Sequence, residues 1–245
     1  MRHVSEGITI LNHYGGFKTA CWLFHHGGEA AVIEMPPFTR YRENAPYSDA
    51  KEVTDRHGIF VKYAFLSHSH WDHCRTLPYF RKKFPHTAFV THASFYADRY
   101  FRSLIHSIPW RRGAYSRNVQ THFDMVFNDV IWRGFIGGEP VYLIYAPKHS
   151  YTDLLIVFKG AMITGDWYIG DLVDCNNLVR PSDKIASINM VMHLIGSLGY
   201  GVHMLFAAHG NNLYYDVDFF SVMEQCKHHH GGRGASIRGR FVRGC

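Results

Sequence analysis

The sequence predicts one large domain of the α/β (α+β) class, which contains both strands and helices. Three observations support this fold class. The chain has 245 residues, 47% of them hydrophobic and 16% aromatic, so a sizeable core is available. Only 19% of the residues are charged, which argues against extensive disorder. Short apolar runs predict strands, and apolar residues spaced three and four apart predict helices.

The first half of the chain reads mainly as strands. Apolar runs predict strands at residues 8–11, 20–24, 30–34, 59–66 and 88–91. The pair Gly27-Gly28 predicts a hairpin between the second and third of these strands. Residues 38–54 are polar and contain tyrosines, so we expect a loop there. Two helices are predicted, at residues 77–84 and 94–105.

The second half follows the same pattern. Strands are predicted at residues 141–146, 154–158, 161–164 and 202–208. The pair Lys159-Gly160 is a plausible tight turn between two of them. A helical apolar face is formed by Ile185, Ile188, Met192 and Ile195. Ser182 is the expected N-cap of this helix, and residues 219–227 are expected to form a closing helix.

The charge distribution separates a nearly neutral domain from a basic end. The net charge is +6, and residues 228–245 contain four arginines and no acid. We expect these residues to form a flexible tail after a domain at residues 1–227. Without the tail the net charge is only +2, which is weak support for a nucleic-acid partner. The five cysteines include no CxxC pair, which favours reduced thiols in the cytoplasm. No apolar run is long enough to span a bilayer, so we expect a soluble protein.

Residues 67–73 read Ser-His-Ser-His-Trp-Asp-His and contain the pattern HxHxDH. Side chains two apart point the same way in extended backbone, so His68 and His70 can hold one cation. Asp72 and His73 follow after a turn and can face a second cation beside the first. Imidazole and carboxylate ligands together suit zinc, and also manganese or iron.

Three further candidate ligands, His149, Asp166 and His209, each follow a predicted buried strand. Loops at one edge of packed sheets are where functional residues gather on a rigid scaffold. A lone histidine after a strand is more often simply hydrogen-bonded. As a set, however, these residues predict additional ligands for the cations at the motif.

Together these motifs resemble the metallo-β-lactamase superfamily over about residues 8–227. They occur in the order HxHxDH, Pro-x-His, Thr-Gly-Asp and His-Gly. The resemblance implies a four-layer αββα sandwich, in which two mixed β-sheets carry helices on their outer faces. It also implies two divalent metal ions, with zinc as the first expectation and iron or manganese as alternatives.

The resemblance assigns ligands to both ions. It implies a first metal at His68, His70 and His149, a second at Asp72, His73 and His209, and a bridge at Asp166. Two adjacent cations could activate a shared hydroxide as the nucleophile, and Asp72 could orient it or pass a proton to the leaving group. The chain departs from the common family pattern at Cys74, Lys148 and Asp153, which would shape the pocket mouth. Cys74 could be a ligand or nucleophile, although packing is the commoner role of such a cysteine.

Substrate contacts are less well defined by the sequence. Tyr151 and Tyr168 lie two residues after candidate ligands, and either could hydrogen-bond an oxyanion or belong to the core. Several arginines could receive an anion or form a solvated surface: Arg99, Arg102, Arg111, Arg112 and Arg117.

The leading functional hypothesis is a hydrolase that acts on a small-molecule ester, lactone, thioester or phosphodiester. The second is a metal-dependent nuclease or phosphodiesterase on RNA or DNA, which the small charge outside the tail disfavours. The third is a redox protein of the flavodiiron type, which shares the implied fold but usually has Glu where His70 stands. A non-catalytic metal-binding protein is the fourth, and a homo-oligomer is possible in each case.

Overall fold

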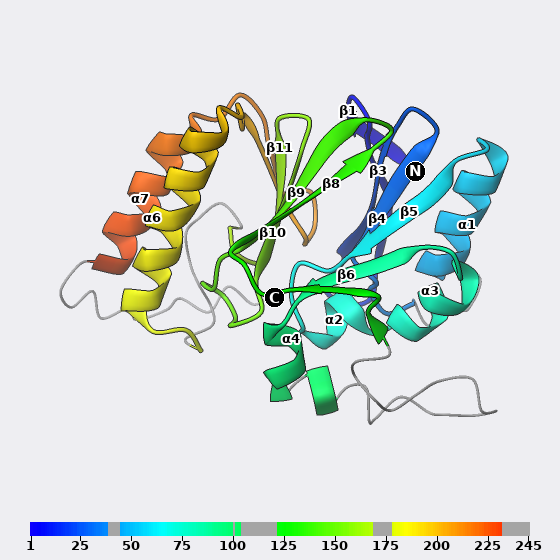
Figure 1. The fold of residues 1–245 in the computed structure, drawn as a ribbon, viewed down its shortest axis with the longest axis horizontal. Helices are drawn as coiled ribbons and strands as arrows, with labels where there is room; N and C mark the ends of the chain where they lie inside the picture. Colours follow the sequence, from blue (N-terminus) through cyan, green and yellow to red (C-terminus); the bar gives the residue numbers. More distant parts are fainter. Residues whose placement is uncertain (39–44, 100, 104–121, 169–177, 232–245) are drawn as a thin grey trace.

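The computed structural model describes residues 1–38, 45–99, 101–103, 122–168 and 178–231. Two mixed β-sheets pack face to face, and helices cover the outer face of each sheet (Figure 1). The predicted α/β class and αββα layering are therefore confirmed. Within the described part of the chain, no helix has the length and apolar character needed to cross a membrane.

The first sheet has seven strands in sequence order. They are β1 (Arg2–Ser5), β2 (Ile8–Tyr14), β3 (Thr19–His26), β4 (Glu29–Ile33), β5 (Phe60–Phe65), β6 (Ala88–His92) and β7 (Met125–Phe127). The first four are antiparallel, and β4 to β7 are parallel. Gly27 and Gly28 both have positive φ at the turn between β3 and β4, as the predicted hairpin requires. Helices α1 (Pro46–Arg56) and α3 (Leu77–Lys83) lie on the outer side of this sheet (Figure 1).

The second sheet has six strands. In spatial order they are β13 (Leu213–Tyr214), β12 (Met204–Ala207), β11 (Ala161–Gly165), β10 (Leu154–Phe158), β9 (Glu139–Tyr145) and β8 (Ile131–Ile136). Only the pair β11–β12 is parallel, and α6 (Pro181–Leu198) lies between these strands in the chain. Helix α7 (Phe219–Gly231) lies beside α6 on the outer face (Figure 1). The turn between β10 and β11 has positive φ at Lys159 and Gly160, which matches the predicted tight turn.

Strand β10 shows how the two core layers form. Leu154, Ile156 and Phe158 point into the core between the sheets. Leu155 and Val157 point the other way, into the core beneath α6 and α7. Side chains alternate across a strand, so a continuous apolar run is what a strand buried on both faces requires.

Stacked aromatic pairs join the two sheets. The rings of Trp22 and Phe206 lie 5.6 Å apart and within 7° of parallel. Phe24 and Phe158 stack at 5.1 Å. All four side chains are fully buried, so these two pairs pack the sheets against each other.

Some element predictions were wrong for identifiable reasons. Residues 46–56 form helix α1 instead of a loop. This helix buries the small residues Ala50 and Thr54, so it lacks the row of large apolar side chains that would have revealed it. Ser182 is not the N-cap of α6: Arg180 is, and Pro181 takes the first helical position that its fixed φ suits.

The helix expected at residues 94–105 is interrupted. Helix α4 (Ser94–Ala97) ends at Asp98, whose backbone is extended and whose carboxylate accepts the N–H of Phe101 at 2.7 Å. Asp98 therefore starts a new helical turn, and residues 104–105 lie outside the described part. At the other end of the chain, α7 continues to Gly231 instead of ending at residue 227. The rest of the expected tail, residues 232–245, also lies outside the described residues.

Candidate metal centre

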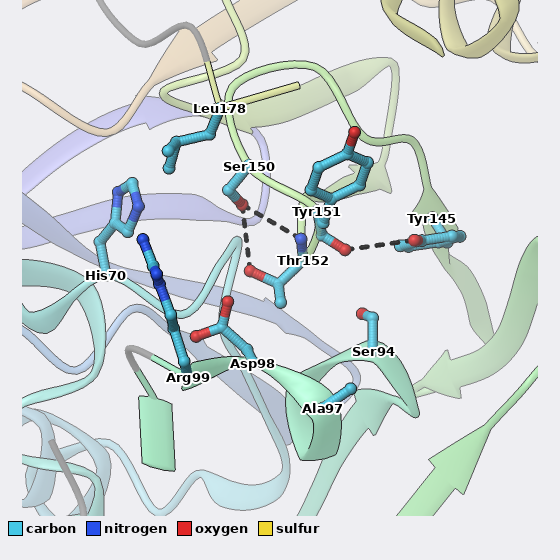
Figure 2. Close-up of a pocket in the computed structure, with 10 residues that line it drawn as sticks. All are labelled: His70, Ser94, Ala97, Asp98, Arg99, Tyr145, Ser150, Tyr151, Thr152 and Leu178. Carbon is cyan, nitrogen blue, oxygen red and sulfur yellow. Dashed lines mark hydrogen bonds between the residues drawn. The ribbon is translucent and has the colours of Figure 1, made fainter. Parts of the chain in front are cut away.

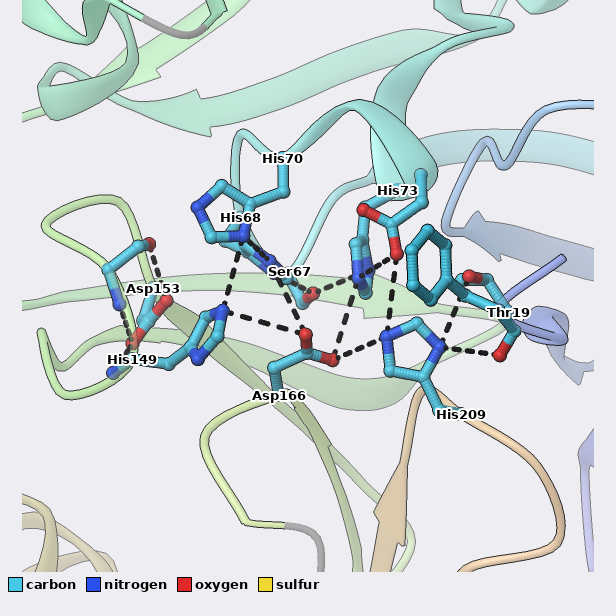
Figure 3. A network of polar contacts seen from close by, with 12 residues as sticks. Thr19, Ser67, His68, His70, His73, His149, Asp153, Asp166 and His209 are labelled. Atoms are coloured by element: carbon cyan, nitrogen blue, oxygen red, sulfur yellow. Dashed lines mark hydrogen bonds and ion pairs between the residues drawn. The ribbon is translucent and has the colours of Figure 1, made fainter. Parts of the chain in front are cut away.

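Four stretches of the chain meet where strands from both sheets end (Figure 3). The loop after β5 carries the HxHxDH motif and continues into the short helix α2 (Trp71–Cys74). The other three stretches are the loops after β9, β11 and β12. The structure gathers in two adjacent groups the side chains predicted as ligands: His68, His70, Asp72, His73, His149, Asp166 and His209.

The first group contains three imidazoles and one carboxylate. His70 Nδ1 lies 3.0 Å from His68 Nε2 and 3.1 Å from His149 Nε2. Asp166 Oδ2 completes the group, 3.5 Å from His149 Nε2. Such a set of nitrogen and oxygen atoms, all within 4.8 Å of one another, can hold a divalent cation.

The second group lies next to the first. Asp72 Oδ2 is 3.4 Å from His73 Nε2 and 3.5 Å from His209 Nε2. Asp166 also reaches this group, because its Oδ1 atom lies 3.0 Å from His209 Nε2 and 3.5 Å from His73 Nε2. One carboxylate therefore faces both groups, with a different oxygen toward each (Figure 3).

Two buried polar atoms indicate that a cation fits here. His73 Nε2 and Asp166 Oδ1 are inaccessible to solvent, and neither makes a hydrogen bond in the described structure, although ligand atoms of the site lie 3.0 to 3.5 Å away. Buried polar atoms are rarely left unpaired, because their desolvation is costly. In the first group, His70 Nδ1 lies about 3 Å from the Nε2 atoms of both His68 and His149, and protons alone satisfy this arrangement of three nitrogens poorly. A divalent cation would satisfy both arrangements.

The protonation states of His68, His70 and Asp166 also suit metal binding. Burial holds the pKa of His68 well below its usual range and lowers that of His70 to about 4, so both rings are neutral near pH 7. Burial alone would raise the pKa of Asp166, but the charge of His73 outweighs it and holds the pKa well below the usual range. Neutral imidazoles and an ionised carboxylate are the forms that bind metals.

Glu34 is a residue of the candidate site that the sequence analysis missed. It follows β4 with a positive φ of 66° and is completely buried. Its Oε1 atom lies 3.1 Å from His73 Nδ1, on the side of the ring opposite the candidate site. Burial would lower the pKa of His73, yet Glu34 and Asp166 together raise it well above its usual value. The one signal in the sequence was an acidic residue at the end of an otherwise apolar strand.

Asp153 fixes the loop that carries His149. Its Oδ2 atom accepts the backbone N–H groups of Lys148, His149 and Ser150 at 2.9, 2.6 and 2.9 Å. The Ser150 hydroxyl donates to Oδ1 at 2.6 Å. This buried carboxylate therefore pairs all three amides at the turn, which limits how far His149 can move.

Two backbone features position the remaining ligands. Gly165 has a positive φ of 56°, and a Cβ atom there would lie 2.4 Å from Ser67 Oγ, so only glycine allows Asp166 to approach the motif this closely. The Nδ1 atom of His209 lies 3.0 Å from the carbonyl oxygen of Phe17. This contact favours a proton on Nδ1 and leaves Nε2 to face the site.

Cys74 belongs to neither ligand group within the described structure. Its thiol donates to the backbone carbonyls of Ser69 and His70 at 3.2 and 3.1 Å. Burial raises the pKa of this thiol well above its usual value, so it is a poor nucleophile. The structural role is therefore the one that the geometry supports.

The candidate substrate residues lie in different surroundings. Tyr151 lines a pocket beside His70, and its hydroxyl donates to Asp183. The Tyr168 ring packs against Tyr214, 5.4 Å away, at the border of the core beneath α6 and α7. Of the arginines, Arg99 lines the same pocket as Tyr151. Arg102 is exposed, and Arg111, Arg112 and Arg117 lie outside the described residues.

Comparison with known proteins decides the family. A family model described as the metallo-β-lactamase superfamily matches residues 14–166, more than half of the chain. The chain belongs to the metallo-β-lactamase superfamily. No curated protein sequence matches it.

Solved structures of this superfamily resemble the chain in fold. A metallo-β-lactamase family protein from Thermus thermophilus has a TM-score of 0.64 at 17% identity, covering 94% of this chain and 81% of its own. The DIM-1 metallo-β-lactamase has a TM-score of 0.65 at 9% identity, covering 94% of this chain and 95% of its own. Rubredoxin oxygen:oxidoreductase from Desulfovibrio gigas has a TM-score of 0.65 at 12% identity, covering 94% of this chain and 61% of its own. The fold is thus shared by hydrolases and an oxidoreductase.

Proposed function

We propose that this protein is a dinuclear metal-dependent hydrolase, and that its substrate is a small-molecule ester, lactone, thioester or phosphodiester. The observation that carries the proposal is the position of Asp166. Its two oxygens face two separate groups of nitrogen and oxygen atoms, 3.5 Å from His149 Nε2 on one side and 3.0 Å from His209 Nε2 on the other. A carboxylate placed in this way suits a pair of cations better than a single one.

The proposed ligand sets follow from the two groups. His68, His70 and His149 would hold the first ion and Asp72, His73 and His209 the second, with Asp166 shared. Zinc is the first expectation for this mixture of imidazole and carboxylate, and iron or manganese are alternatives. Two such ions lower the pKa of a water molecule and stabilise negative charge on the substrate oxygen.

We assign Asp72 a second role, in proton transfer. Burial would raise the pKa of this carboxyl, but the contact with His73 outweighs burial and the pKa is lowered. Asp72 is therefore ionised at neutral pH and can accept a proton or orient the attacking group. Tyr151, in the wall of the adjacent pocket, is the better placed of the two predicted tyrosines to contact substrate.

The residues of the site favour hydrolysis over the redox chemistry that the fold also supports. Proteins of the flavodiiron type usually have Glu at the position of His70, whereas here His70 Nδ1 lies at the centre of the first group. The cellular setting is also a proposal. The three described cysteines, Cys21, Cys74 and Cys226, are all free and buried, which is consistent with a reducing, cytoplasmic compartment.

The proposal is tested by assaying the purified protein against a panel of phosphodiester, lactone, thioester and β-lactam substrates. Asp166→Asn keeps the size of the side chain but removes its charge, and we expect it to lower kcat/KM by about 1,000-fold or more on any active substrate. Asp124→Asn, at an exposed ion pair with Arg81, is the matched control and should keep wild-type activity. Equal activity of Asp166→Asn and wild type would exclude the proposed mechanism.

A further inference from the structure

A pocket opens beside the first ligand group. It has a volume of about 530 Å³, and His70 forms part of its wall. The other walls come from the α4 region and from the loop that follows His149 (Figure 2). A small molecule in this pocket therefore has one end next to the candidate metal centre.

Most hydroxyl groups in the wall are already used by the protein. The Thr152 hydroxyl donates to Ser69 at 2.9 Å, and the Tyr145 hydroxyl donates to the carbonyl of Tyr151 at 3.1 Å. Ser94 differs, because its Oγ atom is buried and has no hydrogen-bond partner in the described structure. Burying a hydroxyl without a partner is unfavourable, so a ligand that hydrogen-bonds Ser94 would remove this cost.

The charged side chains of the wall are Asp98 and Arg99, besides the titratable His70. Asp98 has a structural role, since its Oδ1 accepts the N–H of Phe101 at 2.7 Å and starts the next helical turn. Arg99 is the only arginine or lysine among the described residues that line the pocket, and its guanidinium extends toward the His70 ring (Figure 2). The planar guanidinium can pair with two oxygens of a carboxylate or phosphate at once.

We infer that this pocket binds a negatively charged oxyanion group of the substrate, a carboxylate or a phosphate. Arg99 pairs with the oxyanion and Ser94 donates a hydrogen bond to the same ligand. The bond to be broken then lies on the His70 side, at the metal centre. This inference rests on the proposed hydrolase function for the reaction, but the binding step can be measured without it.

The binding test uses the full-length protein as purified, with inorganic phosphate and succinate as separate probes in calorimetric titrations. Arg99→Gln is expected to weaken binding of the preferred probe about tenfold or more, and Arg99→Lys less than that. Ser94→Ala is expected to weaken it about threefold. Arg102→Gln is the matched control, because it removes the same charge from an exposed neighbour outside the pocket, and it should change binding less than twofold.

The activity test compares a neutral ester with its carboxylated counterpart and with a phosphorylated one, all with the same leaving group. Arg99→Gln should lower kcat/KM about tenfold for the preferred anionic substrate and leave the neutral one within about twofold. Equal effects of Arg99→Gln and Arg102→Gln, or no effect of either, would overturn the inference. If probe binding depends on Arg99 but no substrate is hydrolysed, the pocket assignment stands and the proposed hydrolase function fails.

Discussion

The ammonium group of Lys148 donates a 2.6 Å hydrogen bond to the backbone carbonyl of Trp167, and both residues are buried. The Trp167 indole N–H also donates to the backbone carbonyl of Ala146, two residues before Lys148, at 2.9 Å. Lys148 precedes the ligand His149, and Trp167 follows the ligand Asp166. These two reciprocal bonds therefore tie together the two loops that supply one ligand each.

Replacing Lys148 tests whether this connection positions the metal ligands. Lys148→Met keeps the length of the side chain but leaves the Trp167 carbonyl unpaired. We therefore expect the free energy of unfolding to fall by about 1–3 kcal/mol. We also expect about tenfold weaker zinc binding in a competition titration with a chelator, as is typical for supporting residues. Lys51→Met, on the exposed face of α1, should change neither quantity. Unchanged zinc affinity in Lys148→Met would show that the connection serves stability alone.

Glu34 and His73 make a second pair that can be tested. Glu34→Gln removes the charge behind the His73 ring with little change in shape, so His73 becomes a weaker ligand. We expect a 10- to 100-fold loss of affinity, roughly, for the more weakly held metal equivalent. Glu29→Gln, at the start of strand β4, removes an acid that forms a partly exposed ion pair with Lys62, and it should leave metal affinity unaltered. A result in which the two variants behave alike would argue against a role for Glu34 at the metal centre.

The role of Cys74 can be decided by an isosteric change. A serine hydroxyl can donate to the carbonyls of Ser69 and His70 as the thiol does. We expect Cys74→Ser to keep metal content and kcat/KM within about threefold of wild type, a difference of about 0.6 kcal/mol. Loss of one metal equivalent in this variant would instead identify Cys74 as a ligand.

The stacked pair of Trp22 and Phe206 is expected to contribute to stability and not to chemistry. Phe206→Ala opens a cavity between the sheets and should lower the free energy of unfolding by about 3–5 kcal/mol in denaturant titrations. Phe206→Leu should lower the free energy of unfolding by about 1–2 kcal/mol. The alanine substitution would contradict this view of the core if it cost less than the leucine substitution.

The parts of the site that were predictable from the sequence are those encoded in local patterns. His68 and His70 are two apart, so extended backbone directs them to one side wherever the loop lies. His149, Asp166 and His209 could be grouped because each follows a buried strand, and such strand ends meet at one edge of the fold. These relationships depend on spacing and strand order, which the sequence displays directly.

The parts that were not predictable depend on contacts between distant segments. Glu34 reaches His73 only because β4 and β5 are neighbours in the first sheet, and nothing near Glu34 in the sequence indicates this. Helix α1 was missed because it packs through small residues, Ala50 among them. The pocket around Arg99 depends on the break at Asp98, which divides a segment with apparently continuous helical character.

The central claim is that two adjacent ligand groups hold two metal ions, and metal content per chain tests it most directly. Elemental analysis of the zinc-saturated, desalted protein should give about two equivalents for wild type and about one for His209→Ala, which removes a ligand of the second group only. His203→Ala, outside both groups, is the control and should retain two. One equivalent in wild type, or two in His209→Ala, would contradict the dinuclear centre.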